Sequence, residues 1–269
     1  MLASYHVHTR WSDGDRAVAD CVRAARAMGL DEVGISDHYV LTPDGSQVRW
    51  GMILDALEGY VDAVQSAACE GGEDLVVRLG IEADYFPESA GALKDVLASQ
   101  PFDYVIGAVH LVDGFPIDEN AENWVRLTQS ERDDVIRRYW VRVREMAESR
   151  MFDIAAHLDL TKKFGFQASV DISDEISAAL DAVAAADMSV EINTAGWYFP
   201  CEEAYPVPSI IRQCVDCGIP MLIAADAHDP PDLIRGFDRA RRLLQDMGCT
   251  HIASYAGRRR FMHPLSQCE

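Results

Sequence analysis

The chain has 269 residues, of which 49% are apolar, so it can bury a sizeable core as one large domain or two smaller ones. Its 44 acidic and 24 basic residues give a formal net charge of −20, and the acidic residues are spread along the chain. Such a charge repels a phosphate backbone, which argues against nucleic acid as a partner. No basic-then-apolar leader precedes His6 and no apolar run reaches 18 residues. We therefore expect a cytoplasmic protein without a membrane partner.

Seven apolar segments of strand length recur along the chain, and their continuous apolar character is typical of strands buried in a parallel sheet. We expect these strands, in chain order, at residues 2–9, 32–38, 75–85, 102–110, 152–159, 189–196 and 220–228. Segments with helical periodicity predict helices at residues 15–29, 55–70, 92–100, 130–149, 173–186, 207–218 and 231–248. Residues 251–265 are typical of a terminal hairpin.

The alternation of strands and helices predicts successive βα units, and seven units favour a closed barrel. An open, doubly wound sheet is the alternative, but no glycine-rich phosphate loop follows the first strand. The chain contains no recognisable linker, low-complexity segment or internal repeat. We therefore expect an α/β fold with a single domain over residues 1–269.

The seven cysteines are scattered and odd in number, which argues against a disulfide framework. Cys214 and Cys217 form a Cys-x-x-Cys pair, but they lie within a helical pattern and have no second pair nearby. A structural zinc site needs four ligands, and a redox motif usually opens a helix. We interpret both residues as apolar helix positions.

Six of the eight histidines fall at the carboxyl ends of expected strands, where the side chains of a parallel barrel meet on one face and form active sites. They are His6, His8, His38, His110, His157 and His228. Glu82 and Asp226 occupy the same kind of position. His6 and His8 are two residues apart, so on a strand they point to one side. Imidazoles and carboxylates without cysteine predict a multinuclear zinc, iron or manganese site rather than calcium or magnesium alone.

Seven motifs, in this order, resemble those of the PHP (polymerase and histidinol phosphatase) superfamily: "HVHTRWSDG", "SDH", "GIEADY", "GAVH", "AHLDLTKKFG", "EINTAG" and "ADAH". Together with "EAYP" after "EINTAG", they are most similar to the monofunctional histidinol-phosphate phosphatase branch. The resemblance extends from about residue 5 to about residue 230. It implies a distorted, TIM-barrel-like (β/α) barrel of seven strands with three divalent transition-metal ions.

The resemblance also implies metal ligands at nine positions. The first metal is assigned to His6, His8, Glu82 and Asp226, the second to Glu82, His110 and His157, and the third to Asp13, His38 and His228. Glu82 would bridge the first two ions. The family has either His or Asp at the position of Asp13.

Other residues of these motifs are candidates for supporting roles. We expect Asp37 to orient an imidazole. Asn193 is a candidate for substrate binding at the mouth of the site, whereas Glu191 could equally be a structural pair partner. The segment "VDGFPIDEN" after His110 is long enough to form a loop facing the substrate.

Lys162 and Lys163 follow His157 at the point where this branch carries a basic residue near the phosphate. Both are candidate substrate contacts, and Lys162 is also a candidate catalytic residue. The alternative is a pair of solvated lysines. The branch often has an arginine after "EINTAG", whereas this chain has Trp197 and Tyr198. An aromatic pair there could stack on an imidazole ring of the substrate or cap the barrel.

The expected function is hydrolysis of L-histidinol phosphate, a small phosphate ester of histidine biosynthesis, by attack of a metal-bound hydroxide. Asp226 or a metal-bound water is the candidate donor of the leaving-group proton. Hydrolysis of another small phosphate ester is the main alternative. A nuclease acting on nucleotides or nucleic-acid ends is disfavoured by the acidic charge and the lack of a polymerase segment. A nonenzymatic metal-binding protein is disfavoured because none of the nine ligand positions is missing.

Overall fold

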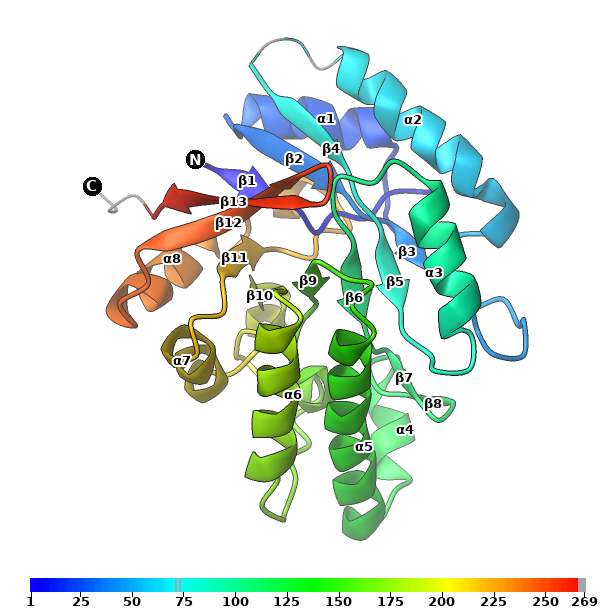
Figure 1. Ribbon diagram of the computed structural model, residues 1–269, viewed down its shortest axis with the longest axis vertical. Helices are drawn as coiled ribbons and strands as arrows, with labels where there is room; N and C mark the ends of the chain where they lie inside the picture. The colour runs from blue at the N-terminus through cyan, green and yellow to red at the C-terminus, as the bar shows by residue number, and fades with distance from the viewer. Residues whose placement is uncertain (71, 73, 266–269) are drawn as a thin grey trace.

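The computed structural model describes residues 1–70, 72 and 74–265, in which short parallel strands are arranged around one axis (Figure 1). These strands are β1 (Ala3–Ser4), β2 (Glu32–Ile35), β3 (His38–Tyr39), β4 (Val76–Leu79), β5 (Glu82–Asp84), β6 (Ile106–Ala108), β9 (Ile154–Ala155), β10 (Ser189–Asn193) and β11 (Met221–Ala224). Each expected strand is confirmed, although all are shorter than their apolar segments.

Two expected strands are interrupted, so that residues 32–38 form β2 and β3 and residues 75–85 form β4 and β5. At these interruptions the hydroxyl of Tyr60 lies 2.8 Å from the carbonyl oxygen of Ile35 and 2.7 Å from that of Gly80. A side chain of the covering helix therefore takes part in hydrogen bonding where the regular ladder stops.

The strands close into a barrel. One sheet has the order β1-β2-β4 and the other the order β11-β10-β9-β6-β5-β3, with every neighbouring pair parallel. The first and last strand segments meet through a parallel bridge between Val7 and Ala227. There, the His8 N–H donates to the Ala227 carbonyl over 2.9 Å, and the Ala227 N–H donates to the His6 carbonyl over 3.0 Å. The expected barrel-like α/β fold is confirmed, with an isolated bridge in place of a regular ladder between its first and last strand segments.

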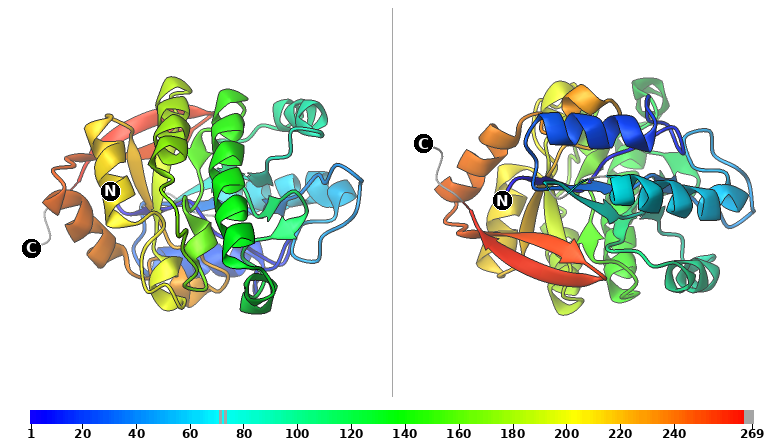
Figure 2. Two further views of the ribbon diagram at one scale, coloured as in Figure 1. Left: turned by 90° about the horizontal axis from the view of Figure 1, so that it is seen from below. Right: turned by 90° about the horizontal axis from the view of Figure 1, so that it is seen from above.

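Helices surround the barrel on its outside (Figure 2). They are α1 (Val18–Ala27), α2 (Leu57–Glu70), α3 (Ala90–Ser99), α4 (Ala121–Val125), α5 (Gln129–Glu148), α6 (Ser173–Ala185), α7 (Pro208–Asp216) and α8 (Phe237–Asp246). All except α4 lie where the periodicity predicts a helix. The segment after His110 additionally forms a small hairpin of β7 (Leu111–Val112) and β8 (Phe115–Pro116). Among the described residues, no helix combines the length and apolar character that a membrane span requires.

The Cys-x-x-Cys pair behaves as interpreted from the sequence. Cys214 is buried within α7, whereas Cys217 caps the same helix and is exposed, and both are free thiols. Cys268 lies outside the described residues.

The expected terminal hairpin is confirmed as β12 (His251–Ala256) paired antiparallel with β13 (Arg259–Pro264). It lies beside β1 and β11 in Figure 1. Tyr255 packs in one buried cluster with Tyr5 and Tyr104 from the barrel interior. Tyr5 and Tyr104 lie on the amino-terminal side of the polar residues of their strand segments, so the hairpin that packs against them covers the amino-terminal end of the barrel. The polar side chains at the carboxyl ends of the strands lie at the opposite end.

The ring of Tyr104 packs so closely in the barrel that glycine is required beside it. A Cβ added to Gly80 would lie 2.1 Å from the ring carbon Cζ, and one added to Gly34 would lie 2.2 Å from the hydroxyl. We expect Gly80→Ala to destabilise the protein by about 1–3 kcal/mol, because the buried ring has no space to move. Gly91→Ala is the matched control, since a Cβ at this helical position meets no atom within 4 Å. Urea unfolding of both variants measures the difference, and equal stability would contradict the packing argument.

Candidate metal centre

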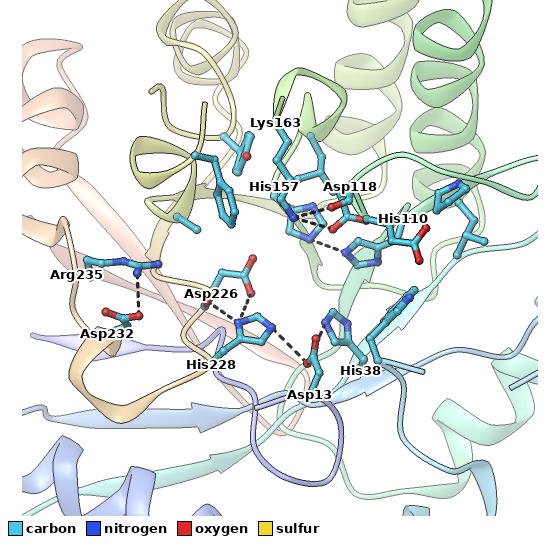
Figure 3. A pocket seen from close by; sticks show the side chains of 18 residues that line it. Asp13, His38, His110, Asp118, His157, Lys163, Asp226, His228, Asp232 and Arg235 are labelled. Carbon is cyan, nitrogen blue, oxygen red and sulfur yellow. Dashed lines mark hydrogen bonds and ion pairs between the residues drawn. The ribbon is translucent and has the colours of Figure 1, made fainter. Parts of the chain in front are cut away.

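The structure brings all nine expected ligands together at the carboxyl ends of the strands. Figure 3 shows those that line the cavity above them, which are Asp13, His38, His110, His157, Asp226 and His228. The nine ligands form four overlapping groups, and within each group the potential ligand atoms lie within 4.8 Å of one another. The residues of these groups are His6, His8, Asp13, His38, Glu82, His110, His157, Asp226 and His228. The placement follows from the fold, because each side chain comes from a strand end or from the loop that follows it.

Glu82 lies at the centre of this cluster and is completely buried. Its Oε2 atom lies 2.7 Å from Nδ1 of His38 and 3.1 Å from Nε2 of His6. Its Oε1 atom lies 3.0 Å from Nε2 of His157 and 3.7 Å from Nε2 of His110. The two oxygens thus face different histidines, which is the arrangement a bridging carboxylate needs.

A further group lies closer to solvent. Asp13 Oδ1 is 3.3 Å from Nε2 of His228 and 3.7 Å from Nε2 of His38. The ring of His8 stacks against the rings of His38 and His228, at centroid distances of 4.2 and 4.3 Å, and these two rings are themselves 6.2 Å apart. On its other side, His8 Nε2 lies 3.0 Å from Oδ1 of Asp226. His8 therefore lies between the expected first and third metal positions.

The donor set fits metal ions better than it fits hydrogen bonding within the protein. Among the described residues, the buried atoms His6 Nε2, His38 Nδ1 and Glu82 Oε2 have no hydrogen-bond partner, although they are in close contact. Nε2 of His110 and Nε2 of His157 also face each other at 3.2 Å. Buried polar atoms without partners are rare in proteins, and imidazole nitrogens and carboxylate oxygens are ligands of zinc and related ions. A metal would satisfy these convergent lone pairs.

Two carboxylates outside the ligand set orient imidazoles from behind. Glu191 Oε2 lies 2.9 Å from Nδ1 of His6, and Asp84 Oδ1 lies 2.7 Å from Nδ1 of His110. Each pairing directs the opposite Nε2 toward the cluster, as in many metal sites. Asp84 is not among the residues expected from the sequence, although its spacing carries a signal. Asp84 stands two residues after Glu82 on one strand and therefore faces the same side.

Electrostatic interactions keep two central groups unprotonated. Burial, together with repulsion from the imidazoles of His38 and His228, lowers the pKa of His8 to about 3. Burial alone would raise the pKa of Glu82, but the imidazoles of His38 and His6 hold it well below its ordinary value. The unprotonated forms of both side chains are the forms that bind a metal.

His110 differs from His8 in this respect. Burial opposes its protonation, but the carboxylates of Asp84 and Glu82 outweigh burial and raise the pKa of His110 to about 10. Without a metal, this imidazole is therefore protonated at neutral pH. Metal binding must displace the proton from Nε2 while the hydrogen bond from Nδ1 to Asp84 is kept.

Asn193 supports the ligands instead of lining the mouth of the site. It is fully buried, and its side-chain amide donates to Oε1 of Glu191 over 2.9 Å and to Oδ2 of Asp226 over 3.2 Å. The same Glu191 oxygen accepts the backbone N–H of His157 over 2.8 Å. The expected substrate contact of Asn193 is therefore replaced by a contact with a metal-ligand candidate, because the residue lies beneath Asp226.

Asp37 also has a different role from the one expected. Its carboxylate accepts hydrogen bonds from the backbone N–H groups of Thr9 (2.7 Å) and Ser12 (3.0 Å) and from both hydroxyls (2.8 and 2.6 Å). It therefore holds the loop between His8 and Asp13 and does not pair with an imidazole. The placement of two expected ligands depends on this buried loop anchor.

The two lysines are placed in different environments. Nζ of Lys162 is buried and donates to Oδ2 of Asp159 over 3.0 Å and to the carbonyl of Ala204 over 2.7 Å. Lys162 is absent from the cavity lining, in contrast to its expected catalytic and substrate-binding roles. Lys163 lines the cavity, where it donates to the carbonyl oxygen (2.9 Å) and to Oδ2 (3.2 Å) of Asp118.

Trp197 is likewise absent from the cavity lining. It belongs to a short 3-10 helix, η3 (Ala195–Tyr198), and its ring lies 4.2 Å from the guanidinium carbon of Arg239. The aromatic residue that follows this helix, Phe199, does line the cavity. The expected stacking of Trp197 on a substrate ring therefore does not match its position, because it packs against the core and lines a separate depression beside Arg239.

The cavity above the ligands has a volume of about 490 Å³, which lies within the range of small-molecule sites. Its remaining walls combine aromatic and charged residues. They include Trp50, Asp118, Glu119, Lys163, Phe199, Tyr205, Asp232 and Arg235. Asp118 and Glu119 belong to the segment after His110, so the expectation that this loop faces the cavity is confirmed.

Comparisons with known proteins agree with this geometry. The family model of the PHP domain matches residues 4–195. A Deinococcus radiodurans protein named "Probable histidinol-phosphatase" is 34% identical over 250 residues, which cover 92% of this chain and 94% of the relative. The "Histidinol-phosphatase" of Lactococcus lactis subsp. lactis is 22% identical over 263 residues, with 94% of each protein covered.

A solved structure has the same fold. It is the crystal structure of histidinol phosphate phosphatase from Lactococcus lactis subsp. lactis complexed with zinc, L-histidinol and phosphate. It is 19% identical to this chain, has a TM-score of 0.81, and covers 97% of this chain and 98% of the solved chain.

These findings define the class of the protein: it belongs to the PHP domain family. Within that family, the curated relatives described above carry the name histidinol-phosphatase.

The two-sided contacts of Glu82 lead to a prediction about metal content. We expect Glu82→Gln to lose at least one bound metal ion per chain and most of the activity, because the amide has one poor ligand atom in place of a carboxylate oxygen. The measurement is elemental analysis of both proteins after purification without chelator. Glu88→Gln is the control, since Glu88 is exposed and outside the cluster. If the two variants retained the same metal content, Glu82 would not bridge two ions.

Proposed function

We propose that this chain is a metal-dependent phosphomonoesterase that hydrolyses L-histidinol phosphate to L-histidinol and inorganic phosphate. The observation that carries the proposal is the cluster of nine convergent ligands at the base of a cavity of small-molecule size. The names of the relatives support the choice of substrate. The reaction would belong to histidine biosynthesis in the cytoplasm.

The proposed cofactor is a set of three divalent transition-metal ions, of zinc, manganese or iron. One ion would be held by His6, His8, Glu82 and Asp226, a second by Glu82, His110 and His157, and a third by Asp13, His38 and His228. The distances around Glu82 support the bridge between the first two. The close approach of Asp13 to His38 and His228 supports the third.

The chemistry that such ions supply when bound is activation of a water molecule and neutralisation of charge on phosphate oxygens. The protein provides rigid positioning for this chemistry through Asp84, Glu191, Asn193 and the Asp37 anchor of the first loop. The positive charge of the bound ions at the base of the cavity would attract a phosphate although the chain as a whole is acidic. The distant surface charges are screened at physiological salt.

Asp226 is supported as a ligand more than as a proton donor. Burial would raise its pKa, but His6 and the hydrogen bond with His8 hold the pKa well below its ordinary value. Its Oδ2 atom already accepts a hydrogen bond from Asn193. A carboxylate that stays ionised at neutral pH has no proton to donate, so we favour a water at the site as the source of the leaving-group proton.

The walls of the cavity fit the rest of the proposed substrate. Asp118 and Glu119 provide carboxylates that can attract the ammonium group of L-histidinol, and Trp50 and Phe199 provide aromatic surfaces for its imidazole ring. Lys163 lies on the same side as Asp118 and pairs with it. A small ester with a phosphate at one end and a cationic amine at the other would complement these charges.

A phosphoesterase acting on another small ester is the second candidate, because the metal cluster alone does not select a leaving group. We expect the purified protein to hydrolyse L-histidinol phosphate with a kcat/KM at least ten times that for p-nitrophenyl phosphate or sugar phosphates, since only the first presents an ammonium group to Asp118 and Glu119. Phosphate release from this panel, measured with zinc, manganese and iron in turn, tests the expectation. Equal values across the panel would assign the protein to general phosphoesterases.

The number of ions has its own test. We expect two to three transition-metal ions per chain in protein purified without chelator, because the ligand groups overlap and, within each group, the imidazole nitrogens and carboxylate oxygens lie within 4.8 Å of one another. Elemental analysis measures this ratio directly. A ratio of one or below, in protein that is active, would contradict the trinuclear arrangement.

A further inference from the structure

The cavity contains a second cationic side chain that the sequence motifs do not mark. Arg235 lies between the 3-10 helix η4 (Pro230–Asp232) and α8, on the segment that follows the ligands Asp226 and His228. Figure 3 shows its guanidinium on the side of Asp226 and His228, across the cavity from Lys163 and Asp118. The two cations of the lining therefore lie on different sides of the metal-ligand candidates (Figure 3).

The position of Arg235 is held by contacts with the end of β10. The hydroxyl of Thr194 donates to the carbonyl of Arg235 over 2.5 Å. Gly236, which begins α8 with a φ of 77°, packs so tightly that an added Cβ would meet Thr194 at 3.0 Å. The guanidinium carbon of Arg235 lies 4.4 Å from the ring centroid of Tyr198, a distance typical of a cation–π contact.

The guanidinium retains unused hydrogen-bond donors. Nη1 donates to Oδ2 of Asp232 over 2.8 Å. Within the described part of the chain, Nε is buried without a partner and Nη2 has no hydrogen bond. Nε is closed off from solvent, so Nη2 is the donor that is left for a ligand in the cavity. A guanidinium commonly donates such an N–H to an oxygen of a phosphate or carboxylate.

We infer that Arg235 binds an oxygen of the substrate phosphate from the Asp226 side of the cavity, and that Tyr198 is its positioning residue. The inference rests on the proposed function only in that the ligand is a phosphate. Arg235 would repel the ammonium end of L-histidinol phosphate, so its charge favours the orientation in which that end lies toward Asp118 and Glu119. Lys163 fits this role less well, because both of its hydrogen bonds go to Asp118.

A neighbouring arginine provides a matched control. Arg239 also stacks on an aromatic residue of η3, with its guanidinium carbon 4.2 Å from the ring of Trp197. It lines a different surface depression, outside the cavity with the metal-ligand candidates. Loss of Arg239 therefore removes one charge and one stacking contact of the same kind without changing the cavity.

The experiment measures binding of inorganic phosphate to the zinc-loaded protein by calorimetry, together with kcat and KM for an ester that the wild type hydrolyses. We expect Arg235→Gln to weaken phosphate binding about tenfold or more and to raise KM, at unchanged metal content, because a charged hydrogen bond is lost. Arg235→Lys should recover part of the loss, and Arg239→Gln should match the wild type. Tyr198→Ala should weaken phosphate binding less than Arg235→Gln, while Tyr198→Phe retains the ring and should have little effect.

The outcomes separate this inference from the proposed function. If the zinc-loaded wild type binds no phosphate, or if Arg235→Gln with full metal content binds it as tightly as the wild type, the role of Arg235 is excluded even when L-histidinol phosphate is hydrolysed. If phosphate binding depends on Arg235 but another ester is the better substrate, the inference holds and the proposed substrate is wrong. If Arg239→Gln weakens binding as much as Arg235→Gln, the effect is one of general charge, and the inference is overturned.

Discussion

The burial of Glu82 among five imidazoles is the interaction on which the rest of the site depends. An ionised carboxylate without solvent is strongly unfavourable unless charge or hydrogen bonds compensate for it. Here the compensating groups all lie within 3.7 Å of one of its two oxygens, and they are His6, His8, His38, His110 and His157. Several of these atoms lack hydrogen bonds within the described residues, so the arrangement is complete only with cations. The barrel must therefore be rigid enough to hold unsatisfied groups in place.

The rigidity comes from the hydrogen bonds behind the ligands and from closure of the barrel. Glu191, Asp84 and Asn193 fix side chains of the cluster, and the Asp37 carboxylate fixes the loop between two of them. The bridge between Val7 and Ala227 joins the first and last strand segments directly beside the ligands that follow them. On the opposite end, the tyrosine-rich core is covered by the terminal hairpin. The apolar cluster that stabilises the barrel therefore lies at one end, and the candidate metal ligands lie at the other.

The aromatic run of residues 197–199 contacts the cations beside the cavity. Each of its side chains lies against a different cation: Trp197 against Arg239, Tyr198 against Arg235 and Phe199 against Lys163. Two of these cations line the cavity and one does not. A short 3-10 helix with two aromatic residues, followed directly by a third, can therefore place two cations beside the same cavity. This gives a physical account of a segment that departs from the resembling branch.

The sequence alone determined the seven strand segments, the helices between them except α4, and eight of the nine candidate ligands, whereas Asp13 was implied by the family resemblance. Their signals are local: apolar runs of strand length, helical periodicity, and histidines at the ends of the runs. The alternation of these elements was sufficient to predict the barrel, and Asp84 could also have been found from its two-residue spacing after Glu82. In contrast, only the tertiary structure decided which of two adjacent lysines faces the cavity. Lys162 and Lys163 have the same chemistry, and their environments differ because Asp159 and Ala204 surround one and Asp118 the other. The roles of Asn193 and Asp37 depended in the same way on partners distant in the sequence. Arg235 reaches the cavity through the turn before α8, because Thr194 and Tyr198 hold it there, and no spacing rule relates those positions.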